Sequence, residues 1–379
     1  MIDLHLVLGS TQYDSRILKE TAAIDRAGMF DRVLVLGLTD EMHGVERREG
    51  GRTTREFSLR TRGLPRNLVG QSIKFAEWRS RILRACRGLP IGVVHCHDLL
   101  PLPVAVRIKR DTGAKLIYDA HELETERAGL RGLRRRLAQR TERRMMRHVD
   151  AIVTVSPSIV DWYRDRHPGV EVVLVRNVPE RVPVNETAEP LRDRLGVPDD
   201  AALFISIGGF SRGRGIERAL CAFADDSVRH HVVFMGFGPL AGEIDAAAAG
   251  CARIHRIPPV ESGDVIRVAA GADVGLSLID DICLSYRFCL PNKLFECLVA
   301  GLPVLCSDLP DQGDLVARYR CGWTIPASAE ALTLELSRIS VDEVRRLRAG
   351  LPDRVAELGW DREAERLVDL YRRLLGRDA

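Results

Sequence analysis

Short apolar runs alternate with helical segments twice along this 379-residue chain, and this alternation restricts its possible folds more than any other feature. Strands joined by helices form crossover units and therefore a mainly parallel sheet. In the first series we expect strands at 3–8, 32–36, 92–96, 115–118, 151–155 and 171–175. In the second series we expect them at 202–207, 231–235, 252–255, 274–278, 304–306 and 322–325. The sequence thus predicts an α/β protein built from two Rossmann-like, doubly wound domains.

A stretch rich in Pro, Asn and charged residues, 177–200, separates the two series and is expected to link the domains. We therefore expect an N-terminal domain over 1–176 and a C-terminal domain over 177–359. Doubly wound sheets bind ligands at the carboxyl ends of their strands, so a cleft lined by these ends is the expected site.

The composition excludes several classes of protein. The formal charge of +3 is nearly balanced, so nucleic acid is not an expected partner. No apolar run reaches the roughly 20 residues that span a bilayer, and no secretion signal is recognised, so a cytoplasmic location is expected. Contact with the inner face of a membrane stays open. The nine cysteines form no C-x-x-C pair, and we expect reduced, mostly buried thiols and no metal site.

A helix starting near Pro291 is the first candidate for a binding element. Pro291 suits a first helical turn, and Gly301 suits the end of the helix. Lys293 and Glu296 lie three residues apart, on the same side of this helix. Because a helix N-terminus attracts anions, this cation and this carboxylate suit a ligand that carries both phosphate and hydroxyl groups. The alternative is an ordinary helix with a solvated ion pair.

The loop 208–215, GGFSRGRG, is the second candidate, since it follows an apolar strand and precedes a helix. Its glycines allow close approach of the backbone to an anion, and Arg212 and Arg214 add fixed positive charge. The loop is neither a P-loop nor G-x-G-x-x-G, so a nicotinamide enzyme is not supported. A tight structural turn would explain the glycines, although it explains the two arginines less well.

These two patterns together resemble the family-4 retaining glycosyltransferases of the GT-B fold. Their phosphate loop typically reads G-R-x-x-x-x-K-G, and the second Glu of their E-x-x-x-x-x-x-x-E helix falls on Glu296. The first half is similar to the same family at 14–20, 93–98, 118–123 and 149–156. The last helix resembles their C-terminal segment, which implies that 360–379 completes the first domain.

The resemblance implies a role for each matching residue. Glu296 would hold the ribose of a nucleotide-sugar, while Arg214 and Lys293 would meet its diphosphate. The remaining expected donor contacts are Gly208, Gly209, Arg212, Gly213, Pro259, Leu290 and Asn292. In the first domain the expected site residues are His121, His97, Ser15 and Arg16. Two positions depart from the family pattern, because Gly209 replaces its Arg and Phe288 replaces its first Glu.

Two of these assignments have a simpler alternative. His121 and His97 could be capping or core histidines, and 14–16 could be only a helix cap. Elsewhere, the arginine-rich helix 131–148 has two interpretations, solvated charge or docking on anionic lipid. We favour solvated charge, with Leu133, Leu137, Met145 and Val149 on the core face of the helix.

The implied reaction is transfer of a sugar, with retention, from a nucleotide diphosphate to an acceptor hydroxyl. The acceptor could be a polysaccharide precursor, a lipid-linked glycan or a secondary metabolite. No D-x-D motif is present, so metal-independent chemistry is expected, with no cofactor besides the nucleotide-sugar. Two alternatives stay open: a nucleotide-sugar epimerase of the same fold, and a donor-binding subunit with weak or no catalysis.

Overall fold

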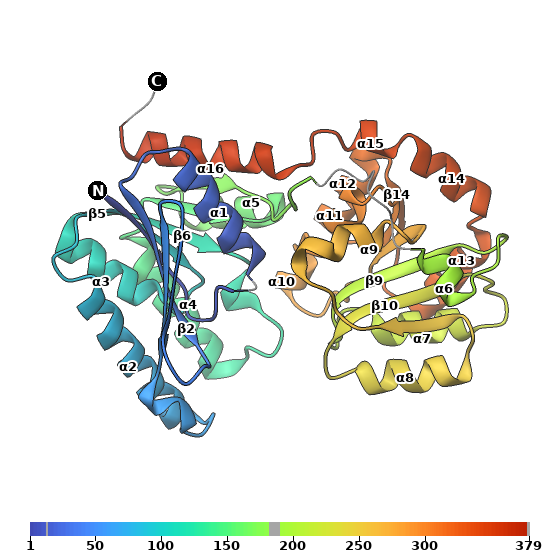
Figure 1. Cartoon of the computed structure of the whole chain (residues 1–379), viewed down its shortest axis with the longest axis horizontal. Coiled ribbons are helices and arrows are strands. Elements are labelled where there is room, and N and C mark those ends of the chain that lie inside the picture. The colour runs from blue at the N-terminus through green and yellow to red at the C-terminus, as the bar shows by residue number, and fades with distance from the viewer. Residues whose placement is uncertain (13, 182–189, 377–379) are drawn as a thin grey trace. The chain divides into compact units, whose positions relative to one another are not determined.

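The computed structural model describes residues 1–12, 14–181 and 190–376 and divides the chain into two compact units (Figure 1). The first unit comprises Met1–Val175 and Ala364–Ala379, and the second comprises Arg176–Glu363. Each unit is a sheet covered by helices on both faces. The predicted α/β class with two doubly wound domains is therefore confirmed.

The first unit contains an eight-stranded sheet in the order β3-β4-β2-β1-β5-β6-β7-β8. Every pair of neighbouring strands is parallel except the pair β3 and β4, which is antiparallel. The strands are β1 Ile2–Leu6, β2 Arg32–Thr39, β3 Val45–Glu49, β4 Arg52–Ser58, β5 Ile91–His97, β6 Lys115–Ala120, β7 Ala151–Thr154 and β8 Glu171–Leu174. Because β1 connects to β2 on one side and neighbours β5 on the other, the strand order reverses between β1 and β5.

The hairpin of β3 and β4 was not anticipated from the sequence. Strand β3 reads VERRE and forms the exposed edge of the sheet, so it needs no apolar face. Charged edge strands protect a sheet from further pairing, and they carry little hydrophobic signal. The hairpin also supplies Glu56, which accepts hydrogen bonds from the backbone N–H (2.6 Å) and the hydroxyl (3.0 Å) of Thr11.

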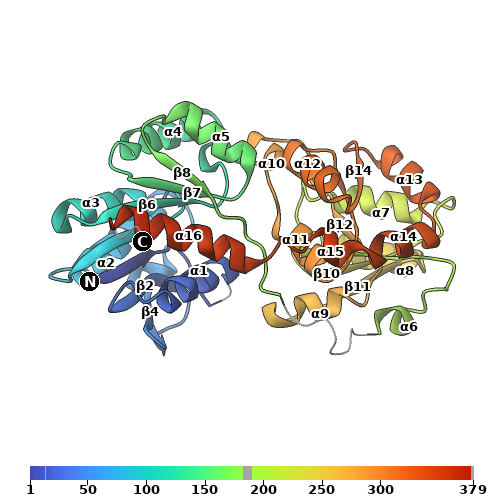
Figure 2. The ribbon, with the colours of Figure 1, turned by 90° about the horizontal axis from the view of Figure 1, so that it is seen from above.

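The helices of the first unit cover both faces of this sheet, with α2 and α3 on one face and α1 and α16 on the other (Figures 1 and 2). They are α1 Ser15–Arg26, α2 Leu68–Ala85, α3 Leu102–Thr112, α4 Gly132–Met146, α5 Pro157–Arg166 and α16 Trp360–Leu374. From Ala364 onward α16 counts with the first unit. The expected core face of α4 was wrong for Leu133 and Leu137, which are exposed, whereas Val149 is buried as expected and Met146 is buried in addition.

The second unit is an all-parallel sheet in the order β11-β10-β9-β12-β13-β14. Its strands are β9 Leu203–Gly209, β10 His231–Phe237, β11 Ile254–Ile257, β12 Val274–Ser277, β13 Val304–Ser307 and β14 Gly322–Ile325. Its helices are α6 Leu191–Leu195, α7 Ile216–Ala224, α8 Ala241–Gly250, α9 Val265–Ala269, α10 Leu284–Arg287, α11 Asn292–Val299, α12 Pro310–Tyr319, α13 Ala329–Arg338, α14 Val341–Ala349 and α15 Leu351–Arg354.

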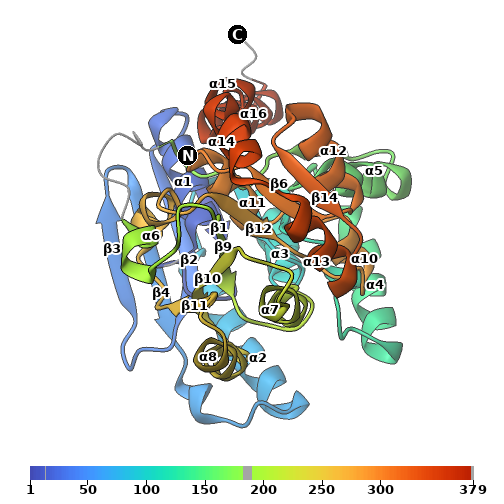
Figure 3. The same cartoon turned by 90° about the vertical axis from the view of Figure 1, so that its right-hand side faces the viewer.

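Two apolar cores lie on the two faces of this second sheet. Figure 3 shows α7 and α8 on one side of the strands and α11 and α12 on the other. Phe223 and Ile244 belong to the first core, and Phe295 and Leu315 belong to the second. The strand order reverses between β9 and β12, so the loops that follow these two strands adjoin at the position where such sheets bind ligands.

A close contact between glycines shapes the first of these loops. Gly236 on β10 pairs with Gly208 on β9, and a Cβ at Gly236 would overlap the carbonyl oxygen of Gly208. Gly208 itself has a φ of +104°, which side chains rarely adopt. The turn out of β9 therefore depends on the missing side chain of its neighbour.

We predict that Gly236→Ala destabilises the second unit by about 2 kcal/mol or more, because the new methyl group must displace backbone atoms. Urea unfolding of the variant measures this loss. Gly242→Ala is the matched control, since a Cβ there meets nothing within 4 Å and the free energy of unfolding should stay near that of the wild type. Equal stability of the two variants would contradict the role assigned to the glycine contact.

Candidate functional site

Three neighbouring strands of the first unit carry polar side chains at alternating positions. They are Asp3 and His5 on β1, His95 and His97 on β5, and Asp119 on β6, and all five are buried. Alternate residues of a strand lie on one face of a sheet, so these groups form a polar layer under the helices that cover that face. Buried polar groups are costly unless they are hydrogen-bonded, and this layer meets that requirement almost completely.

The imidazoles of this polar layer form a hydrogen-bonded chain. His5 Nε2 lies 2.9 Å from Asp3 Oδ2, and His5 Nδ1 lies 3.0 Å from His97 Nε2. His97 Nδ1 in turn lies 3.2 Å from His121 Nε2. His95 stacks between His5 and His97, at ring-centroid distances of 4.6 Å to each. Burial lowers the pKa of His97 to about 4, so this histidine is neutral at physiological pH.

The covering helices supply the partners of the polar layer. Arg16 on α1 binds both oxygens of Asp119, at 2.8 and 3.0 Å, and donates to the carbonyl of Val175 at 2.8 Å. Tyr371 on α16 lies 2.8 Å from His95 Nδ1 and donates to Asp3 at 3.3 Å. Arg16 is only 2% exposed. The structure therefore gives Arg16 an inward, structural position, although the sequence suggested contact with a ligand.

His121 is the member of the chain that reaches the surface. It follows β6, its side chain is 23% exposed, and its Nε2 lies 3.1 Å from Asp119 Oδ2. Its Nδ1 lies 3.7 Å from Asp98 Oδ1, and Asp98 has a φ of +67°, which is unusual for a residue other than glycine. Burial alone would lower the pKa of His121, but Asp119 and Asp98 raise it to about 10. His121 therefore presents a cationic donor at the carboxyl edge of the sheet.

Ser15 and His97 complete the predicted residues of the first unit. Ser15 is the first residue of α1, where Asp14 accepts the N–H groups of Arg16 and Ile17 and so caps the helix as predicted. His97 is buried and bonds only to its neighbours in the layer, so it supports His121 and does not itself face a ligand.

Four side chains of the layer, Glu20, His95, His97 and Asp119, place possible ligand atoms within 4.8 Å of one another. A cation does not fit among them, because Arg16 already binds Asp119 and lies 3.0 Å from Glu20. Burial raises the pKa of Glu20 to about 8, so this carboxyl is largely protonated near neutrality. The layer is thus close to electrically compensated without a metal ion.

In the second unit, the predicted loop 208–215 lies at the reversal of strand order. Gly208 and Gly209 are exposed, and a Cβ on either would meet nothing within 4 Å, so space is open beside their backbone. Gly213 packs against α10, where a Cβ would lie 2.8 Å from Tyr286 Cε2. Its carbonyl accepts the N–H of Asp280 at 3.0 Å, which ties the loop after β9 to the loop after β12.

Two cations meet beside this loop. Arg214 lies over the ring of Tyr286, at 5.0 Å from its centroid, and Lys293 in the first turn of α11 is 9% exposed. Burial, together with the charge of Arg214, lowers the pKa of Lys293 to about 8. Among the described residues neither cation forms an ion pair with a carboxylate. Positive charge that is buried without a counter-ion indicates a place for an anionic ligand.

The other predicted residues of the second unit differ in their access to this place. Glu296 is half-buried one turn after Lys293, and its charge acts to raise the pKa of Lys293, against the effect of burial. Asn292 is exposed at the start of α11. Arg212 and Pro259 are exposed on the loops after β9 and β11. The side chain of Leu290 belongs to the apolar core, which leaves only its backbone for a ligand.

Arg218 is a residue that the sequence analysis missed. It lies in the first turn of α7, pairs with Asp280 at 2.7 Å, and is within 3.4 Å of Ser307 Oγ. Its Nε and Nη1 are buried without a hydrogen-bond acceptor among the described residues. Its place shortly after the Gly loop is the sequence signal from which it could have been predicted. Its position braces the loops that follow β9, β12 and β13.

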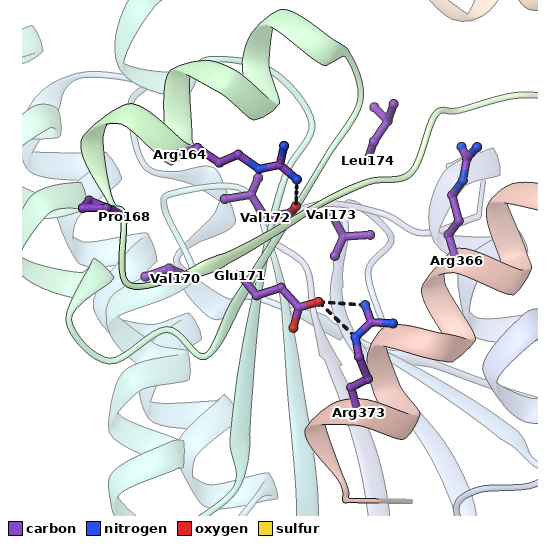
Figure 4. Close-up of a pocket in the computed structure, with 9 residues that line it drawn as sticks. All are labelled: Arg164, Pro168, Val170, Glu171, Val172, Val173, Leu174, Arg366 and Arg373. Carbon is purple, nitrogen blue, oxygen red and sulfur yellow. Dashed lines mark hydrogen bonds and ion pairs between the residues drawn. The ribbon is translucent and has the colours of Figure 1, made fainter. Parts of the chain in front are cut away.

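A surface hollow of about 720 Å³ lies elsewhere in the first unit, between β8, α5 and α16 (Figure 4). Its charged groups are engaged, since Arg373 binds Glu171 at 2.7 and 3.1 Å and Arg164 donates to the carbonyl of Val172 at 3.1 Å. These bonds attach α16 and α5 to the edge strand β8. The hollow contains none of the residues described above as candidate ligand groups, and we assign it a structural role.

Comparison with known proteins places this architecture in a class. Residues 15–179 match the family described as Glycosyl transferase 4-like domain. The chain has the GT-B fold, and over 15–179, somewhat less than half of its length, it is similar to 4-like glycosyl transferases, in agreement with the resemblance seen in the sequence. Among the described residues no helix is both long and apolar enough to cross a membrane.

Three particular proteins show how far the similarity extends. TuaC of Bacillus subtilis (strain 168), whose name assigns it to teichuronic acid biosynthesis as a glycosyltransferase, is 26% identical over 159 residues. That match covers 42% of this chain and 38% of the relative. Sucrose-phosphate synthase from Thermosynechococcus elongatus superposes with a TM-score of 0.79 at 17% identity, over 100% of both chains. Anabaena HepE in complex with UDP and glucose gives a TM-score of 0.70 at 14% identity, over 98% of this chain and 99% of that one.

We predict that His121→Gln changes the pH dependence of stability. The unfolded chain releases this proton near pH 6.5, whereas the folded chain keeps it up to about pH 10. The stabilisation is therefore complete below about pH 6.5 and is lost as pH rises through about 10, with a slope of up to about 1.4 kcal/mol per pH unit. Urea unfolding between pH 6.5 and 8.5 should show this decline in the wild type and a shallower one in the variant. Parallel curves for the two proteins would contradict the raised pKa.

Proposed function

We propose that this protein is a retaining glycosyltransferase that moves a sugar from a nucleotide-diphosphate sugar to an acceptor hydroxyl. The observation that carries the proposal is the pair Arg214 and Lys293. Lys293 is buried and Arg214 half-buried, neither forms an ion pair with a carboxylate in the part of the chain that the structure describes, and both lie beside an open glycine loop. A diphosphate supplies the negative charge that this place lacks. The GT-B fold, and the UDP bound to HepE in a structure of that fold, support the same ligand class.

In the proposed reaction, the bond between the anomeric carbon and the diphosphate oxygen breaks, and charge develops on the leaving phosphate. Arg214, Lys293 and the N–H groups of the loop would stabilise that charge more in the transition state than in the ground state. Protein cations would thereby perform the role that a divalent ion performs in other transferases. We further propose that the acceptor oxygen bonds to the anomeric carbon on the face that the diphosphate leaves, while the leaving phosphate accepts the proton of the acceptor hydroxyl. Attack on that face would give retention, and no separate base would be needed.

Glu296 and His121 have distinct proposed roles. Glu296 would accept hydrogen bonds from the two ribose hydroxyls, as a carboxylate can do for a vicinal diol. His121, held protonated by Asp119 and Asp98, would donate from Nδ1 to a sugar hydroxyl. The acceptor would be a sugar, a lipid-linked glycan or a small molecule. Phe288 stands where the family has a donor-binding Glu. We therefore expect the specificity for the donor sugar to differ from that of family members that keep this Glu.

Three outcomes of one assay separate this proposal from its alternatives. A thermal-shift screen of nucleoside diphosphates first identifies the base, since a ligand that binds the folded state raises Tm. The matching nucleotide-sugars are then incubated with and without candidate acceptors. Release of nucleoside diphosphate only with an acceptor supports transfer, whereas isomerised donor without an acceptor supports an epimerase. Donor binding without turnover on any acceptor supports a binding subunit.

We predict that affinity for the nucleoside diphosphate identified in that screen falls as pH rises through about 8. Lys293 loses its proton near this pH in the free protein, and only the ammonium form attracts the diphosphate. Above pH 8 the loss should approach tenfold per pH unit, because binding must then take up a proton. Titration calorimetry from pH 7 to 9.5 measures it. In Lys293→Arg the cation persists throughout this range, so the affinity should change little with pH.

Arg214→Ala is expected to reduce turnover by a factor of about 10² or more, because a fixed charge on the leaving group is removed. The matched control is Arg212→Ala, which removes an exposed arginine from the same loop and should cost far less. Steady-state kinetics with saturating acceptor give both values. Equal turnover of the two variants would argue against the special position of Arg214.

A further inference from the structure

Helix α4 carries an apolar and basic surface that the proposed reaction does not use. Every residue from 131 to 137 is exposed, including Leu133 (81% exposed) and Leu137 (63% exposed). The side of α4 that packs on its own unit carries Glu142 and Met146, which are both buried. Figure 2 shows α4 beside α5 at the outside of the first unit. Two leucines on the outer face of a helix cannot be explained by the core of this unit.

The positions of the exposed residues follow one face of the helix. Leu133, Leu137, Arg140 and Arg144 have the i, i+4, i+7, i+11 spacing that places side chains in one line. Arg134, Arg136 and Arg143 are also exposed and flank that line. We call these seven residues the α4 outer face. It contains five arginines, two leucines and no acid.

The arginines of this face are available to a partner. Arg135, which is exposed on the opposite side of the helix from this face, pairs with Glu126. By contrast, none of the five arginines of the outer face forms an ion pair within the part of the chain that the structure describes. The chain as a whole is nearly neutral, so this concentration of uncompensated charge is local. An anionic partner would supply the charge that the face lacks.

We propose that the α4 outer face docks on a bilayer that contains anionic phospholipid. Helices that lie in a membrane interface combine apolar side chains with flanking cations, as this face does. The leucines would enter the acyl boundary, and the long arginine stems would let their guanidinium groups reach the phosphates. A nucleic acid would also attract the arginines, but it would gain nothing from Leu133 and Leu137. Charge and exposure together therefore favour lipid.

Co-sedimentation with vesicles tests this inference on the full chain. One set of vesicles contains phosphatidylcholine alone, and the other contains equal parts of phosphatidylcholine and phosphatidylglycerol. We expect binding to the anionic vesicles only, weakened by salt because the attraction is partly electrostatic. Arg136→Gln/Arg140→Gln/Arg144→Gln should weaken binding by a factor on the order of 10². Leu133→Ser/Leu137→Ser should weaken it by about tenfold or more.

Helix α13 of the second unit provides a matched control. Leu334→Ser/Arg338→Gln removes an exposed leucine and an exposed arginine four residues apart, and its binding should equal that of the wild type. All the substituted residues are exposed, so thermal melts should show each variant to be folded. The proposal is overturned if the wild type ignores anionic vesicles, or if the leucine variant binds them as tightly as the wild type. It is equally overturned if only the arginine variant is weakened and an oligonucleotide competes fully with the vesicles.

The vesicle experiment needs neither donor nor acceptor, so its outcome is independent of the proposed transfer reaction. A consequence for the substrate follows only where the proposed function also holds. A chain docked through α4 would encounter acceptors anchored in the same bilayer more often than acceptors in solution. Of the acceptor classes considered, docking therefore favours lipid-linked glycans.

Discussion

The uncompensated charge of Lys293 and Arg214 is the constraint on which the interpretation of the second unit depends. A buried ammonium group loses hydration, and here a neighbouring guanidinium adds repulsion, so the pKa of Lys293 is lowered to about 8. Such an arrangement lowers the stability of the free protein slightly and is relieved when an anion binds. The surrounding elements keep the cost small and the position fixed: α11 holds Lys293, the ring of Tyr286 supports Arg214, and the glycines leave space beside both.

In the first unit, by contrast, the buried charges are compensated within the chain. Its polar layer also buries charge, but Arg16 compensates Asp119, and Tyr371 bonds to His95 and Asp3. Such a network, once its members are satisfied, fixes side chains with little freedom to reorient. Among the described residues, this hydrogen-bonded network reaches the surface at His121. The charge and ring orientation of His121 are determined by Asp119 and Asp98. The layer therefore positions one donor without itself offering a binding site.

The sequence predicted the fold well because apolar strands and helix signals are local properties. The strands from β5 to β8 and from β9 to β14 were recognised within a few residues, and the fold class followed from their alternation. The hairpin of β3 and β4 was missed because an exposed, charged edge has no apolar period. The linker also contained an unforeseen short helix, α6. Periodicity cannot reveal which charged residues will find partners across the sheet.

For the same reason, the environment of the candidate site residues was harder to predict from the sequence than the fold. The sequence places Arg214 and Lys293 near helix starts, as the structure does, but their closeness and the burial of Lys293 depend on packing between two loops. Arg16 looked like a ligand group because it follows a first loop, and only the structure shows Asp119 beside it. The alternation of Asp3 and His5, and of His95 and His97, was visible in the sequence. Its meaning required the knowledge that these strands are neighbours.

The two units differ in whether their cations have acidic partners within the chain, and this difference indicates where an anionic ligand would bind. In the first unit the buried cation has an acidic partner in the chain, so an added anion would compete with Asp119 for Arg16. In the second unit no described carboxylate forms an ion pair with Lys293 or Arg214, and only the charge of Glu296 acts on Lys293 from a distance, so an added anion displaces no ion pair. The same reasoning applies at the surface, where Arg135 has Glu126 but the α4 outer face has no acid. In each case the missing counter-charge, more than the number of cations, identifies the region that an anionic partner would occupy.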